Sequence, residues 1–144
     1  MAPECAFCRL VAAPEEVVFQ DAATVAFLDH RPVFPGHTLV VPRAHHETLA
    51  DLPADLVGPL FRTVQLVARA VEEALAADGT FVALNNKVSQ SVPHLHVHVV
   101  PRKRKDGLRG FFWPRQKYES DDEVRAVAGR IREAAARLQT AGPR

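Results

Sequence analysis

Hydrophobic and polar positions follow two different periods along the chain, and these periods predict both strands and helices. Short runs rich in β-branched and aromatic residues, bounded by turn residues, predict strands over 17–20, 24–29, 37–42 and 80–84. Only residues 21–23 separate the first two runs, which is the length of a hairpin connection. The chain is therefore predicted to pair its first two strands directly.

Two longer stretches carry the helical period instead. Between residues 53 and 77 the apolar positions recur at steps of four and three, which predicts an amphipathic helix packed on a sheet: Leu56, Leu60, Val64, Val67, Val71 and Leu75. Pro59 lies inside this stretch, and because proline removes a backbone donor we expect the helix to kink or restart there. Ser120 and the acidic residues after it predict the start of a second helix with one apolar side: Val124, Val127, Ala128, Ile131, Ala135 and Leu138.

Histidine and apolar residues alternate strictly in the segment 93–101. This is the period of a strand, so His94, His96 and His98 should share one face while the apolar residues between them share the other. Residues two apart on one face of a strand are roughly 6.5 to 7 Å apart, so three imidazoles could engage one phosphate-sized group. Two alternatives are open: histidines that are only structural, and a zinc-hydrolase site that uses two of them with a further ligand and a water.

Local charge distinguishes the surroundings of this segment from the rest of the chain. Residues 79–105 contain no Asp or Glu, while Lys87 and the run 102–105 are cationic, which suits an anionic substrate. Over the whole chain, 18 Lys and Arg nearly balance 17 Asp and Glu. There is therefore no global field to recruit a nucleic acid polymer or an acidic membrane.

Length and composition bound the class of protein. At 144 residues with 47% hydrophobic content, the chain suits one domain over residues 1–144. The N-terminus lacks the pattern of a signal peptide, and no run of about 18 apolar residues occurs. We therefore expect a soluble, cytoplasmic protein.

The two cysteines, Cys5 and Cys8, have C-x-x-C spacing and supply half of a tetrahedral zinc site. His45, His46 and His94 are the available further ligands. Structural zinc, metal-free cysteines and a redox pair are the three alternatives, and the last lacks the strand-then-helix context of a redox motif. Residues 9–13 could form a short helix after the pair.

Polar residues 85–91 separate the predicted strand 80–84 from the histidine segment. Their side chains and loop amides could hold phosphate oxygens. His37, directly after Gly36, is a candidate partner of the three histidines.

These motifs, in this order, resemble the histidine-triad (HIT) family of nucleotide-binding proteins. The resemblance rests on His94-Leu-His96-Val-His98-Val-Val100, on Leu28-Asp29 with Pro32, on the segment 36–45 and on Ser89-Gln90-Ser91-Val92. It covers nearly the whole chain from Cys5 to Pro101. The resemblance implies an α+β fold with a mainly antiparallel sheet of about five strands, one long helix packed on it, a C-terminal helix, and a homodimer.

The resemblance also implies roles for individual residues. His96 would be the nucleophile, with His98 and Ser91 at the phosphate and His37 in the hydrogen-bond network around the triad. The nucleotide, a purine nucleotide in our prediction, would be bound by Phe27, Asp29, His30, Asn85 and Gln90. Asp29 would take the ribose hydroxyls, and Phe27 and His30 would lie near the base. A structural zinc ion would be held by Cys5, Cys8, His45 and His94. The family's loop at 85–90 usually contains a glycine, which this chain lacks, and asparagine tolerates a left-handed backbone better than most residues.

The predicted activity is hydrolysis of a nucleoside polyphosphate at the α-phosphate through a nucleotidyl-histidine. Neutral imidazole can attack phosphorus near pH 7 without a separate strong base. The basic run 102–105 and Trp113, which could pack beside a second base, favour a dinucleoside polyphosphate. The alternatives are a nucleoside phosphoramidase and a nucleotide-binding sensor with little turnover.

Overall fold

The computed structural model describes residues 4–14, 17–108 and 115–141. The chain divides into two compact units, residues 1–106 and 107–144, which are described separately. Trp113, one of the residues on which we based the substrate prediction, lies outside the described residues.

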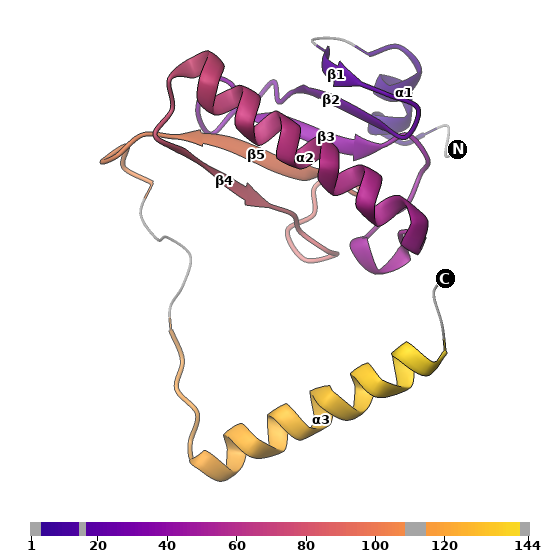
Figure 1. Ribbon diagram of the computed structural model, residues 1–144, viewed down its shortest axis with the longest axis vertical. Coiled ribbons are helices and arrows are strands. Elements are labelled where there is room, and N and C mark those ends of the chain that lie inside the picture. The colour runs from indigo at the N-terminus through magenta and orange to yellow at the C-terminus, as the bar shows by residue number, and fades with distance from the viewer. Residues whose placement is uncertain (1–3, 15–16, 109–114, 142–144) are drawn as a thin grey trace. The chain divides into compact units, whose positions relative to one another are not determined.

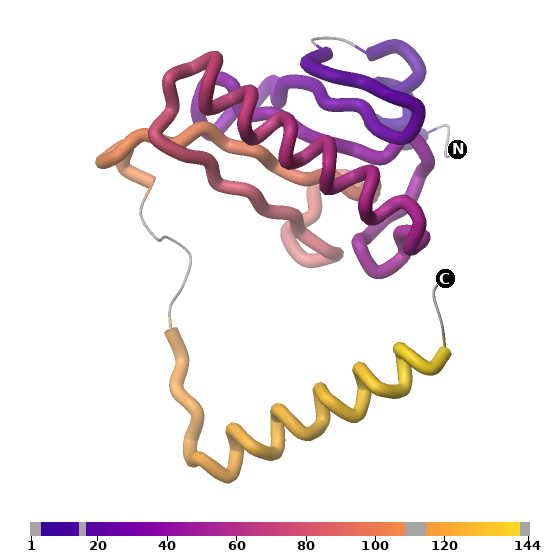
Figure 2. The backbone as a smooth tube through the Cα atoms, viewed as in Figure 1, coloured from indigo at the N-terminus to yellow at the C-terminus, as the bar shows by residue number. Residues whose placement is uncertain are grey.

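The first unit is built on one antiparallel sheet of five strands (Figures 1 and 2). Its spatial order is β1-β2-β3-β5-β4. The strands are β1 (Val17–Gln20), β2 (Thr24–Leu28), β3 (Thr38–Pro42), β4 (Gly79–Ala83) and β5 (Val97–Arg102). The α+β fold and the five-stranded antiparallel sheet are therefore confirmed.

Helix α2 (Ala54–Leu75) crosses one face of the sheet (Figure 1). Its buried residues form one core cluster with alternate side chains of the strands and of the extended segment before β5, among them Leu95, Val97 and Val99. Each buried aliphatic side chain stabilises the fold by about 1.5–3 kcal/mol. The apolar half of the histidine segment thus packs under α2, as the alternation predicts.

The other face of the sheet carries a second, smaller core cluster. Val25, Phe27, Leu39 and Val41 project from β2 and β3, where they pack with residues of the short helix α1 (Ala6–Ala12). Strands β2 and β3 are buried along almost their full length because both of their faces are covered. The histidines of the 93–101 segment lie on this second side.

Two boundaries differ from the prediction. Strand β5 begins only at Val97, so His94 and His96 precede it. In this segment the amide of Leu95 donates to the carbonyl of His46, a loop residue, so the chain is extended without a neighbouring strand. Helix α2 continues through Pro59 as one element, because the missing donor removes one bond close to the helix start. It ends at Ala76, which adopts a left-handed backbone with φ 49°.

The second unit contains helix α3 (Asp121–Thr140). The side chain of Ser120 accepts a hydrogen bond from the amide of Glu123, which confirms the predicted cap. Its described residues are all at least partly exposed. Among the described residues of both units, no helix has the length and apolar character needed to cross a membrane.

Candidate functional site

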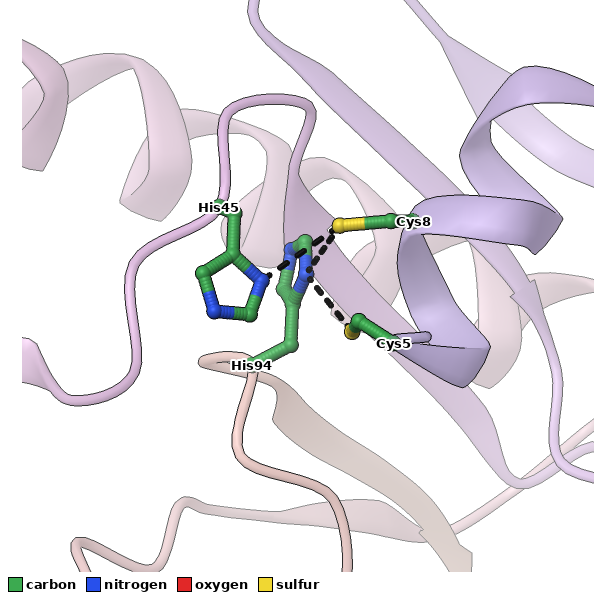
Figure 3. Close-up of side chains that lie close together, drawn as sticks. All are labelled: Cys5, Cys8, His45 and His94. Carbon is green, nitrogen blue, oxygen red and sulfur yellow. Dashed lines mark hydrogen bonds between the residues drawn. The ribbon is translucent and has the colours of Figure 1, made fainter. Parts of the chain in front are cut away.

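Cys5, Cys8, His45 and His94 come together in one cluster, with all four ligand atoms within 4.8 Å of one another (Figure 3). The sulfur atoms of Cys5 and Cys8 are each 3.6 Å from Nδ1 of His94, and that of Cys8 is 3.4 Å from Nδ1 of His45. A tetrahedral zinc with Zn–S of about 2.3 Å and Zn–N of about 2.0–2.1 Å separates sulfur from nitrogen by about 3.5 Å. The observed distances match this value.

Backbone hydrogen bonding prepares His94 as a ligand. Its Nε2 lies 2.8 Å from the carbonyl oxygen of Pro42, and because a carbonyl only accepts, Nε2 carries the proton. Nδ1 therefore presents a lone pair to the two sulfurs. Burial lowers the pKa of His94, which keeps the ring neutral. Both cysteines are buried, and neither forms a disulfide. The donor set and its protonation fit zinc, and the cluster contains His45 and not His46.

His96 is buried beside this cluster, and its tautomer is also set by the backbone. Its Nδ1 lies 2.8 Å from the carbonyl oxygen of His94, so Nδ1 carries the proton. Nε2 is left with an unshared lone pair. This is the protonation state that a nucleophilic imidazole requires.

His37 and His98 form a second network, in which the direction of the hydrogen bonds is reversed. The amide of Val33 donates to Nδ1 of His37 over 3.1 Å, so the proton of His37 is on Nε2. That Nε2 lies 2.9 Å from Nδ1 of His98 and donates to it. His98 must therefore carry its own proton on Nε2. The hydrogen-bond chain from Val33 through His37 thus ends at the Nε2–H group of His98.

The charge state of this network is set by burial. Burial and the neighbouring His96 and His37 lower the pKa of His98 to about 4, against an opposing effect of Asp29. The pKa of His37 is lowered mainly by burial, although Asp29 Oδ2 lies 3.7 Å from its Nε2. Both rings are therefore neutral near pH 7.

The ring of Phe7, which packs against His96, also lines an open pocket of about 350 Å³. Its lining is mostly apolar, with one carboxylate: Phe7, Leu10, Phe27, Leu28, Asp29, His30, Arg31 and Leu39. Three of the predicted nucleotide-binding residues, Phe27, Asp29 and His30, thus line one pocket. The sequence patterns did not predict Phe7, Leu10 or Leu39 at this pocket, and their signal was limited to an aromatic residue inside the C-x-x-C spacing.

The loop before the histidines is held in shape by its own polar side chains. The amide group of Gln90 accepts from the amide of Lys87 over 2.8 Å and donates to the carbonyl of Glu47 over 2.6 Å. Asn85 donates to the carbonyl of Ser89 over 3.2 Å. Lys87 and Ser89, not an asparagine, adopt the left-handed backbone, with φ 68° and 61°. Asn85 thus binds within the loop, Gln90 joins the loop to Glu47, and Ser91 is exposed beside it.

The basic run lies at the far end of β5. Arg102 lies four positions after His98, which is roughly 13 Å along a strand. Arg102 makes two hydrogen bonds of 2.6 and 3.0 Å to Asp106, and Nζ of Lys103 donates to the carbonyl of Ala76. These cations therefore bind neighbouring acceptors at a distance from the triad.

A family model described as HIT domain matches residues 11–105. The chain is 36% identical over 125 residues to Protein hit of Bacillus subtilis, covering 84% of each chain. It is 33% identical over 93 residues to an asymmetrical bis(5'-nucleosyl)-tetraphosphatase of Schizosaccharomyces pombe, covering 63% of this chain and 51% of that protein. A zinc-bound histidine triad family protein of Mycobacterium smegmatis superposes with a TM-score of 0.69 at 36% identity, covering 96% of this chain and 97% of that one.

Proposed function

Because the chain belongs to the HIT family, we propose that it hydrolyses a nucleotide at the α-phosphate, with His96 as the nucleophile. The observation that carries this proposal is the hydrogen bond from Nδ1–H of His96 to the carbonyl of His94. This bond leaves the Nε2 lone pair available for attack. Among the described histidines of the triad, only His96 combines that lone pair with a place outside the Cys/His cluster.

The reaction has two steps. In the first, Nε2 of His96 forms a bond to the α-phosphorus while the bond from phosphorus to the leaving oxygen breaks and that oxygen keeps the electron pair. The product is a nucleotidyl imidazolium, whose positive charge is stabilised by the Nδ1–H bond to the His94 carbonyl. In the second step, water attacks the phosphorus, the P–N bond breaks, and a mononucleotide and one proton are released.

The pocket beside Phe7 and Phe27 is the site that we propose for the base of a purine nucleotide. Flat apolar walls suit an aromatic base, and His30 lies at the same pocket. Asp29 would accept hydrogen bonds from the ribose hydroxyls. The N–H at Nε2 of His98 would donate to a phosphate oxygen, together with backbone amides of the loop that Asn85 and Gln90 hold in place and with Ser91.

The protonation of His98 supports a particular leaving group. With a pKa of about 4, the ring is neutral and donates a hydrogen bond, but it has no extra proton to give away. A phosphate leaving group departs as a stable anion, whereas an amine needs a proton. We therefore favour a dinucleoside polyphosphate over a nucleoside phosphoramidate. The basic run 102–105 no longer supports this choice, because it lies far from His98.

Mass spectrometry of acid-quenched protein tests the proposal. The protein is mixed with a diadenosine polyphosphate or with an adenosine phosphoramidate for a fraction of one turnover. We expect a nucleotidyl adduct on His96, formed faster from the polyphosphate. Faster adduct formation from the phosphoramidate would contradict the substrate assignment. Nucleotide binding without any adduct would identify a sensor.

We also propose that Cys5, Cys8, His45 and His94 hold one zinc ion with a structural role. The ion would join helix α1 to the loop of His45 and to the triad segment, and its binding would contribute to folding. Two cysteines without a disulfide suit a reducing compartment, and we propose the cytoplasm.

A homodimer is the assembly that we propose. Several large apolar side chains are partly exposed, among them Val82 on the edge strand β4 and Phe61 and Leu66 on α2. Burial of such residues between two copies would stabilise the pair. Light scattering after size-exclusion chromatography should give twice the chain mass, and a monomer at all concentrations would contradict it.

A further inference from the structure

Phe7 lies between the two cysteines of the C-x-x-C pair and contacts three other rings. Its ring centroid is 5.0 Å from that of His96, with an interplanar angle of 84°. It is 6.0 Å from that of His94 at 73°, and 5.5 Å from that of Phe27 at 67°. One side chain therefore contacts the attacking imidazole, a residue of the Cys/His cluster and a wall of the pocket.

This contact supplies a restraint on His96 that its hydrogen bond lacks. The bond from Nδ1–H to the His94 carbonyl sets the tautomer of His96. A single hydrogen bond still allows the ring to tilt about the axis of that bond. The angle of attack on phosphorus depends on that tilt, and catalysis is sensitive to small errors in such angles. A nearly perpendicular aromatic pair changes the balance between ring orientations by about 2- to 10-fold.

Phe7 depends in turn on how α1 is held. Helix α1 has only seven residues, its N-cap Cys5 makes no side-chain capping bond, and its first turn contains no acidic residue. A helix of this length is not stable by itself in water. Cys5 and Cys8 flank Phe7, and the sulfurs of both approach His94 (Figure 3). The cluster therefore anchors the turn that carries Phe7.

We propose that Phe7 is a positioning residue for His96, and that metal bound at the Cys/His cluster sets the position of Phe7. This inference rests on the proposed function, since it takes His96 as the nucleophile. The metal then influences the chemical step through the packing of one aromatic ring, without contact with the substrate.

The first arm of the test compares Phe7→Leu with Val64→Ala, both loaded with zinc. Val64 is 5% exposed and belongs to the core under α2, on the opposite face of the sheet from Phe7. Both variants should keep one zinc per chain and melt at a lower temperature. Only Phe7→Leu should slow the single-turnover formation of the His96 adduct, by about tenfold. Phe7→Met, which keeps the volume without a ring, should be as slow and serves if Phe7→Leu folds poorly.

The second arm removes the metal. Wild-type protein treated with a chelator should lose about the same factor in the single-turnover rate as Phe7→Leu. Chelation of Phe7→Leu should then cost little more, because both changes act through the same ring. Fully additive losses would mean that metal and Phe7 act separately, and the proposal would be wrong.

The third arm needs no turnover, so it separates this proposal from the proposed function. In substrate-free, zinc-loaded wild type, the ring of His96 should give one sharp set of NMR resonances. Phe7→Leu and chelated wild type should both broaden them. If wild type forms no adduct, the proposed function fails, and the resonances still decide the role of Phe7. An unchanged adduct rate together with unchanged His96 resonances in Phe7→Leu would overturn that role.

Discussion

Two clusters of side chains that could ligate a metal lie next to His96, and each contains two histidines. One contains Cys5, Cys8, His45 and His94; the other contains Asp29, His37 and His98. In each cluster the ligand atoms lie within 4.8 Å of one another. By residue type and spacing alone, both could hold a metal ion.

The backbone behind each cluster makes them different. A carbonyl, that of Pro42, accepts from the outer nitrogen of His94, so the inner nitrogen shows a lone pair. An amide, that of Val33, donates to the outer nitrogen of His37, so the inner nitrogen shows a proton. A metal between His37 and His98 would have to displace that proton and break the bond to Val33. The comparison teaches that the hydrogen bond behind a histidine decides whether its inner nitrogen presents a lone pair, which suits a metal ion, or a proton, which suits an acceptor.

The largest effect is expected at His96, where the two clusters meet. His96→Asn removes the nitrogen that we propose as the nucleophile, so turnover should fall more than about 100-fold while the fold and nucleotide binding are largely kept. Steady-state rates and nucleotide titration measure the two quantities. A variant that kept a larger share of the rate would show that another group attacks phosphorus.

The second-largest effect is expected from loss of the metal. Of the neighbouring histidines His45 and His46, only His45 should be needed for metal binding. His45→Ala and Cys5→Ser should lose zinc and melt at least about 10 °C lower, since a structural ion contributes several kcal/mol to folding. His46→Ala is the matched control, because His46 is outside the cluster. Catalysis should fall less than in His96→Asn. Elemental analysis that found no metal in protein purified without chelator would refute the zinc assignment.

The second cluster should respond differently to the same measurement. His37→Asn should keep one zinc per chain, and the wild type should never bind a second ion at stoichiometric zinc. The adduct rate of His37→Asn should fall by about 10- to 100-fold, because His98 loses the donor that sets its tautomer. A stoichiometry of two in the wild type, or one that falls to zero in His37→Asn, would contradict the distinction between the clusters.

The smallest expected effect is the dependence of the melting temperature on pH. His98 faces His96, His37 and Asp29, and its pKa is lowered from 6.5 to about 4 in the folded protein. Below pH 6.5 the unfolded chain therefore binds the proton more readily than the folded chain. The melting temperature should fall as the pH decreases from about 6.5 to about 4. The melting temperature of His98→Asn should fall less steeply over the same pH range. Equal slopes of melting temperature against pH in the variant and the wild type would contradict the lowered pKa of His98.

Much of the fold followed from periodicity. Alternation in the segment 93–101 predicted that Leu95, Val97 and Val99 pack on one side, and they lie under α2. Apolar steps of three and four predicted α2 within a few residues. The start of β5 at Val97 was not predictable, because an extended chain with or without a strand partner has the same alternation.

The candidate site was predicted only as far as residue types allow. The family resemblance selected His45 over His46, and the cluster contains His45. The direction of each hydrogen bond depends on backbone groups such as Pro42 and Val33, which no side-chain pattern reveals. Gln90 stays a predicted phosphate contact, and its side chain also hydrogen-bonds to the backbone of Lys87 and Glu47, which the residue pattern did not indicate.

The positions of the histidine protons are the central claim, and NMR can observe them directly. Long-range correlation of ring protons with ring nitrogens, in zinc-loaded protein at pH 7, distinguishes the two tautomers of each ring. We predict protons on Nε2 of His94, His37 and His98, and on Nδ1 of His96. A proton on Nε2 of His96, or on Nδ1 of His37, would contradict the account.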